Sequence, residues 1–148
     1  MVPASFTGRG NQVAKQKERY KAWGKAYTSA WVSGDVEAMM DCWAQDCIHI
    51  AFDPFGDHRI TQGREALREL YADKAANRSN KKLIEHEVLS ANKERGIFHT
   101  WVSWTTKDGE EWACTHINIV HLDENDRCAK YTEWNVAWAK EEQTESPD

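Results

Sequence analysis

A histidine and a glutamate near the end of the sequence have the types and placement of an acid/base pair. His116 and Glu133 lie in two successive stretches that alternate between polar and apolar residues, as strands do. A carboxylate opposite an imidazole fixes the tautomer of the ring and raises its pKa, which suits proton transfer near neutral pH. An ordinary cross-strand charge pair is the alternative, and the sequence leaves both open.

Asp53 is a second candidate base. It ends the apolar stretch CIHIAFD and precedes a Pro-Phe-Gly turn. A carboxylate among apolar neighbours at the end of a strand is expected to have a raised pKa and can act as a general base. Aspartate before proline also commonly starts a turn, so a purely structural role is the alternative.

The elements that must position these residues are helices followed by a meander of strands. Aromatic residues at helical spacing, Gly34 as a stop and Asp35 as an N-cap separate the first two helices. The predicted helices cover about 11–33, 35–46 and 63–74, and the predicted strands cover about 47–53, 82–91, 97–106, 111–122 and 127–138. This order indicates an α+β fold, with the helices packed on one face of a curved antiparallel sheet.

The turns predict which residues of the meander share a face. A two-residue loop at Asp108-Gly109 and an even-numbered loop within DEND define the register. Residues opposite each other in antiparallel strands point to the same side, which predicts these rows: His99–Asn118–Tyr131, Trp101–His116–Glu133 and Ser103–Cys114–Asn135. The other side then carries Phe98, Val102, Trp104, Ile117, Ile119, Trp134, Val136 and Trp138. A one-residue error in either loop would exchange the faces of a strand.

Two arrangements fit this pattern. In the commoner one, the apolar side is the core and the polar side meets water. In the other, the helices cover the polar side and enclose a pocket. The apolar side is then too hydrophobic to remain wet, and a homodimer through this outer face is expected.

The stretch YTSAWVSGDVEAMMDCWAQD, followed by FDPFG and GREALRELYAD, resembles the ketosteroid isomerase and SnoaL-type polyketide cyclase branch of the nuclear transport factor 2-like superfamily. The resemblance spans roughly residues 20 to 135. It implies a cone-shaped curved sheet wrapped around a long N-terminal helix, with three helices enclosing a pocket. It therefore favours the pocket over a wetted polar face.

The resemblance also implies roles for individual residues. Tyr27 matches a tyrosine that donates to a developing enolate, and Asp53 matches the general base. Asn118 stands where relatives carry a protonated aspartic acid, and an amide can donate the same hydrogen bond. With the acid/base pair, the predicted catalytic set is Asp53, Tyr27, Asn118, His116, Glu133 and His99. The predicted substrate-binding walls, for which core packing is the alternative, are Trp31, Trp43, Tyr71, Trp101 and Tyr131.

Length and composition set the remaining expectations. The 148 residues and net charge of −5 suit one domain, here residues 11–139 between a flexible N-terminus (1–10) and a flexible tail (140–148). Scattered basic residues argue against nucleic acid as a partner, and no apolar run approaches the ~20 residues of a membrane span. Without a signal-like stretch, a cytoplasmic location with four free thiols is expected.

These features predict a cofactor-independent enzyme of the isomerase, cyclase or dehydratase (lyase) type. Its substrate would be a small apolar carbonyl or hydroxyl compound of polyketide, terpenoid or steroid character. No metal is expected, because the histidines lack HxH or HExxH spacing. The alternative is a non-catalytic small-molecule-binding or dimerisation module of the same fold.

Overall fold

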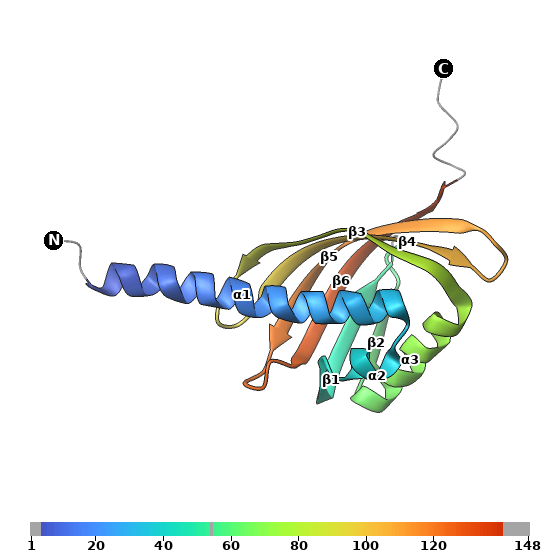
Figure 1. Ribbon diagram of the computed structural model, residues 1–148. Coiled ribbons are helices and arrows are strands. Elements are labelled where there is room, and N and C mark those ends of the chain that lie inside the picture. The colour runs from blue at the N-terminus through green and yellow to red at the C-terminus, as the bar shows by residue number, and fades with distance from the viewer. Residues whose placement is uncertain (1–3, 54, 141–148) are drawn as a thin grey trace, which may run out of the picture.

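A curved sheet packed against a long helix organises the computed structural model, which describes residues 4–53 and 55–140 (Figure 1). The helices in this part of the chain are α1 (Ala4–Ser33), α2 (Val36–Met40) and α3 (Arg64–Asn77). The strands are β1 (Trp43–Phe52), β2 (His58–Gln62), β3 (Arg78–Ala91), β4 (Gly96–Thr106), β5 (Glu111–Leu122) and β6 (Cys128–Ala139). They form one sheet in the order β2-β1-β6-β5-β4-β3, which is antiparallel except between β1 and β6. The predicted α+β class is thereby confirmed.

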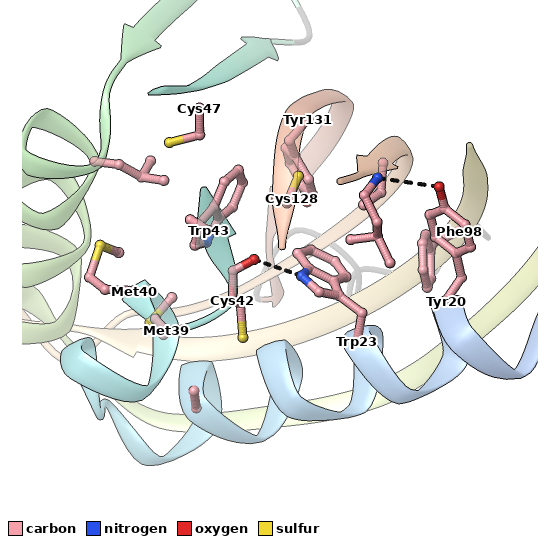
Figure 2. Packing of buried hydrophobic residues seen from close by; sticks show 14 of the residues in the cluster. Tyr20, Trp23, Met39, Met40, Cys42, Trp43, Cys47, Phe98, Cys128 and Tyr131 are labelled. Atoms are coloured by element: carbon pink, nitrogen blue, oxygen red, sulfur yellow. Dashed lines mark hydrogen bonds between the residues drawn. The ribbon is translucent and has the colours of Figure 1, made fainter. Parts of the chain in front are cut away.

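The aromatic stripe of α1 explains how this helix attaches to the sheet. Tyr20 and Trp23 are buried, and both point from α1 into the core (Figure 2). The indole nitrogen of Trp23 donates to the carbonyl of Cys42 at 2.8 Å, and the Tyr20 hydroxyl accepts from the amide of Leu122 at 3.3 Å. Gly96 opens β4 directly against Tyr20, and a Cβ there would lie 2.7 Å from the ring's Cγ atom. The absence of a side chain at Gly96 therefore lets the helix approach the sheet.

Several element boundaries differ from the prediction. α1 begins at Ala4 rather than near residue 11, and most of the predicted tail lies outside the described residues. Asp35 caps α2 as predicted, accepting from the amide of Ala38 at 3.0 Å, but the helix ends at Met40. The chain extends there because Trp43 begins β1 and pairs with Cys128 of β6. The short β2, which pairs antiparallel with β1, was not predicted.

The predicted register of β4 against β5 is wrong by one residue. The amide of Thr106 donates to the carbonyl of Glu110, so the loop is the three residues 107–109, with Gly109 at φ 87°. This is the bulged alternative to a two-residue turn. As a result Thr100 pairs with His116, and Phe98 pairs with Asn118. Residues 98, 102 and 104 of β4 therefore share a face with His116, whereas 99, 101 and 103 lie on the opposite face.

The predicted register of β5 against β6 is wrong by two residues, which preserves the faces. The amide of Asp123 donates to the carbonyl of Arg127, so Asp123 lies opposite Arg127 instead of Asp126, which shifts the register by one residue. A bulge between His121 and Leu122 adds a second shift. Asn118 therefore lies opposite Glu133, and His116 lies opposite Asn135. Because side chains alternate with a period of two, His116 and Glu133 still point to the same side.

In the part of the chain that the structure describes, no helix is both long and apolar enough to cross a membrane. The cysteines at 42, 47, 114 and 128 are all buried free thiols.

Candidate active site

A cavity of about 500 Å³ lies between α1, α3 and the helix-covered face of the sheet. Its wall is partly apolar, with Trp31, Val102 and Trp104 contributing large side chains. Polar side chains from β5 and β6 also face the cavity, and these are His116, Asn118, Tyr131, Glu133 and Asn135. The helices thus cover the polar side of the meander, as the pocket arrangement requires.

The Glu133 carboxylate is the centre of the polar cluster, and its side chain is 12 % exposed. Its Oε1 atom lies 3.9 Å from Nε2 of His49, and its Oε2 atom lies 3.9 Å from Nε2 of His116. The hydroxyl of Tyr131 donates to Oε2 at 3.0 Å. The structure therefore places His116 and Glu133 together and adds His49, which the sequence did not single out.

Burial and neighbouring charges set the protonation states of this cluster. Burial raises the pKa of Glu133, but His116, His49, Lys74 and the Tyr131 hydrogen bond together bring that pKa below its ordinary value. Burial lowers the pKa of His116. The nearby Glu133 raises that pKa but offsets only part of the effect of burial. The expectation that Glu133 gives His116 a raised pKa is therefore wrong in its net direction. At neutral pH the cluster holds an ionised carboxylate beside an uncharged imidazole.

The Tyr131 hydroxyl links Glu133 to Asn118. An ionised carboxylate only accepts hydrogen bonds, so the single Tyr131 proton is committed to Glu133. The Tyr131 oxygen then accepts from Nδ2 of Asn118 at 2.9 Å, which assigns the orientation of the amide. The second N–H of Asn118 remains available, and the buried Oδ1 atom has no hydrogen-bond partner among the described residues.

Two tyrosines from different helices form a hydroxyl pair in the wall of the cavity. The Tyr27 hydroxyl on α1 is hydrogen-bonded to that of Tyr71 on α3. Burial raises the pKa of both phenols, so both keep their protons. One shared hydrogen bond uses one of the two protons. The other O–H can therefore donate to a bound oxygen.

Asp53 lies at the exposed edge of the cavity, apart from the buried cluster. Its Oδ1 atom accepts from the amides of Phe55 at 2.9 Å and Asp57 at 3.0 Å. This is the turn-forming arrangement that was the alternative to a base. It occupies one carboxylate oxygen with backbone donors.

Three other predicted site residues do not line the cavity. His99 lies on the outer face of the sheet, where Nε2 contacts the Thr115 hydroxyl at 2.7 Å. Trp101 is on the same outer face, 6.4 Å from Trp138 between ring centroids. Both were misplaced by the one-residue register error. Trp43 is fully buried in the core beside Tyr131, which is the packing alternative (Figure 2). The remaining predicted walls, Trp31, Tyr71 and Tyr131, do line the cavity.

Other cavity residues were not predicted as functional. Lys74 falls on the same side of α3 as Leu67 and Tyr71, and this spacing was the available signal. Arg78 opens β3 before the predicted strand at about 82–91, and His86 lies within that strand but outside the predicted rows of the shared face. Burial lowers the pKa of His86 to about 4, and its Nδ1 atom contacts the Thr100 hydroxyl at 3.0 Å. Across the described residues, no group of three or more His, Cys, Asp or Glu is arranged to hold a metal ion.

Comparison with known proteins agrees with this architecture. PrhC from Penicillium brasilianum NBRC 6234 has a TM-score of 0.68 at 19% identity, covering 81% of this chain and 82% of its own. A proposed polyketide cyclase from Xanthomonas campestris pv. campestris has a TM-score of 0.67 at 17% identity, and the match covers 86% of this chain and 95% of the cyclase. An NTF2-like protein from Anabaena variabilis ATCC 29413 has a TM-score of 0.68 at 13% identity, and the match covers 80% of this chain and 87% of that protein. At such identities, these similarities show the fold.

The family itself is shown by sequence. No curated protein matches the chain at a significant level. The family model of the SnoaL-like domain, however, matches residues 25–131, which is well over half of the chain. The resemblance inferred from the motifs is thus confirmed, and the chain belongs to the SnoaL-like domain family.

Proposed function

We propose that this chain is a cofactor-independent acid/base enzyme that moves a proton on a small apolar carbonyl or hydroxyl compound, leading to isomerisation, cyclisation or dehydration. The observation that carries the proposal is the largely buried Glu133 carboxylate, 12% exposed, which faces His116, His49 and Tyr131 beside a cavity. Burying a charge is costly, and perturbed titratable groups that converge on a cleft are typical of functional sites.

His116 is the group we assign to receive the proton. It lines the cavity, and its lowered pKa keeps the ring uncharged and able to accept at neutral pH. Glu133 is placed to stabilise the imidazolium that forms, at 3.9 Å from Nε2. The protonated ring can then return the proton to another carbon or to a leaving hydroxyl. This assignment moves the role of base from Asp53 at the cavity edge to the buried pair.

The oxyanion that develops when a carbonyl substrate loses a proton needs donors. The free O–H of the Tyr27–Tyr71 pair and the second N–H of Asn118 are the donors we assign. Donors that are already oriented in a water-poor site stabilise developing charge without reorganisation. The large side chains of Trp31, Val102 and Trp104 support an apolar skeleton.

Proton transfer can be tested without knowing the natural substrate. A panel of cyclic, terpenoid and steroid ketones is incubated with the protein in D₂O, and deuterium at the carbons next to the carbonyl is measured by NMR. We expect exchange above the buffer rate for at least one ketone. His116→Gln and Glu133→Gln should each reduce that exchange by about 100-fold or more, the usual contribution of a positioned acid/base group.

Two variants serve as controls for this experiment. His99→Gln removes a histidine from the opposite face of the same sheet, and exchange should continue at the wild-type rate. Asp53→Asn changes a residue at the cavity edge and should reduce deuterium exchange less than His116→Gln or Glu133→Gln does. Exchange that survives both His116→Gln and Glu133→Gln would refute the acid/base assignment. Ketones that bind without any exchange would instead support a non-catalytic binding module.

We also propose that the chain forms a homodimer through the outer face of the sheet. Apolar side chains of adjacent strands are exposed there, with Ile117 at 38%, Trp134 at 44% and Val136 at 56%. Because such a contiguous apolar surface is unfavourable in water, pairing with a second copy is the natural way to cover it.

A further inference from the structure

Two basic side chains line the same cavity as the acid/base cluster. Lys74 comes from the last turn of α3, and Arg78 follows directly after that helix. Each lies over an aromatic ring, with Lys74 Nζ 5.7 Å from the Tyr71 centroid and Arg78 Cζ 4.2 Å from the Trp104 centroid. Cation–π contacts of this kind hold the charges against the cavity wall.

Neither cation has a carboxylate partner within 4.0 Å in residues 4–53 and 55–140. Asp53 and Asp57 lie at the exposed edge of the cavity, where Arg59 is also exposed. Glu133 is the buried carboxylate of the cavity, and its oxygens contact the two histidines and Tyr131 instead. The buried part of the site therefore has two fixed cations for one carboxylate, an excess of one positive charge.

The two cations are also poorly solvated and repel each other. Burial lowers the pKa of Lys74 and of Arg78, and the charge of Arg78 lowers that of Lys74 further. A bound anion would relieve both effects. A guanidinium presents a planar fork of N–H donors that matches a carboxylate in two parallel hydrogen bonds, and the ammonium adds a third donor.

We propose, building on the function proposed above, that the substrate carries one carboxylate group, which binds to Lys74 and Arg78. Its apolar skeleton lies along Trp31 and Trp104, and its reacting carbon lies near His116. The single excess positive charge selects a monoanion over a neutral compound of the same shape. This defines the substrate class as an apolar carboxylic acid with a carbonyl or hydroxyl group.

A pair of probes with equal shape and different charge tests this inference. Adamantane-1-acetate is a compact apolar monoanion, and adamantane-1-acetamide is its neutral counterpart. Both are transparent where tryptophan absorbs, so the fluorescence of the cavity tryptophans and isothermal titration calorimetry both report binding. We expect the acetate to bind about tenfold or more tightly than the amide. This ratio corresponds to the usual free energy of one hydrogen bond to a charged group.

Variants then locate the source of the preference. In Lys74→Met combined with Arg78→Met, the ratio of the two affinities should fall to near one. The amide should still bind, which shows that the cavity is intact. Lys130→Met, an exposed change on β6 with the same loss of charge as either single variant, should keep the full ratio. If the double variant does not fold, the single variants Lys74→Met and Arg78→Met should each lower the ratio of the two affinities, and a ratio unchanged in both would overturn the inference.

The outcomes separate this inference from the proposed function. Binding is measured without turnover, so the Glu133→Gln protein should show the reduced deuterium exchange given above and should still bind the acetate more tightly than the amide. An acetate that binds no better than the amide, or does not bind at all, would overturn the inference and leave the acid/base proposal untouched. A preference that persists when Lys74 and Arg78 are both replaced would also overturn it.

Discussion

His49→Phe should make the protein less sensitive to acid. His49 is 1% exposed, stacks on Tyr131 with 5.0 Å between ring centroids, and has a buried Nδ1 atom without a partner among the described residues. Burial lowers its pKa from 6.5 to about 4. Phenylalanine keeps an aromatic ring at this position and removes the titration.

The magnitude follows from linkage between protonation and folding. Between pH 6.5 and pH 4 the unfolded chain binds a proton at His49 and the folded chain does not, so the free energy of unfolding falls as the pH falls. With these two pKa values, the loss from pH 7 to pH 5 is about 2 kcal/mol, at ~1.4 kcal/mol per pKa unit. His49→Phe lacks this loss, whereas a group that His49 does not perturb, such as His86, contributes to both proteins alike.

Urea unfolding followed by tryptophan fluorescence provides the assay. Both proteins are measured at pH 7, 6 and 5 and at one protein concentration, since self-association would change the apparent stability. The two proteins are compared only in how much their free energy of unfolding changes with pH, because the larger phenylalanine ring also affects packing. If His49→Phe loses as much free energy of unfolding between pH 7 and pH 5 as the wild type, His49 is not a buried neutral imidazole and the reasoning is refuted.

Three further predictions concern other parts of the molecule. Gly96→Ala should lower the free energy of unfolding by about 1–3 kcal/mol in urea, because the new methyl group overlaps Tyr20; an unchanged midpoint would contradict the close approach. Tyr131→Phe removes a hydrogen bond that lowers the pKa of Glu133, so the acidic limb of the pH–exchange profile should move to higher pH. Trp134→Glu with Val136→Lys should yield a monomer in light scattering, and a dimer that persists would refute the proposed interface.

The sequence predicted the elements and the family better than the contacts within the site. Helical periodicity and turn residues located α1, α3 and the four strands of the meander, because these are local signals. The short β2 and the parallel pairing of β1 with β6 depend on contacts distant in sequence, which no local pattern encodes.

Register explains which site residues were placed correctly. At Asp108-Gly109 the loop has one residue more than predicted, which shifts the register of β4 against β5 by one residue. His99 and Trp101 therefore lie outside the site, and Val102 lies in it. Between β5 and β6 a loop shift and a bulge each add one residue, so the pair His116 and Glu133 was kept. Loop lengths that differ by one residue have similar sequence signatures, so sequence alone did not distinguish them.

The position of β6 in the sheet has a consequence for synthesis on the ribosome. This strand lies between β1 and β5, and β1 has only the short β2 as its other neighbour. Before β6 emerges, the nascent chain holds β2-β1 and β5-β4-β3 as two separate ladders, and Tyr131 and Glu133 are absent from the cavity. The core therefore closes only after the last described strand leaves the exit tunnel. Formation of the acid/base cluster and completion of the sheet are then the same late, long-range event in folding.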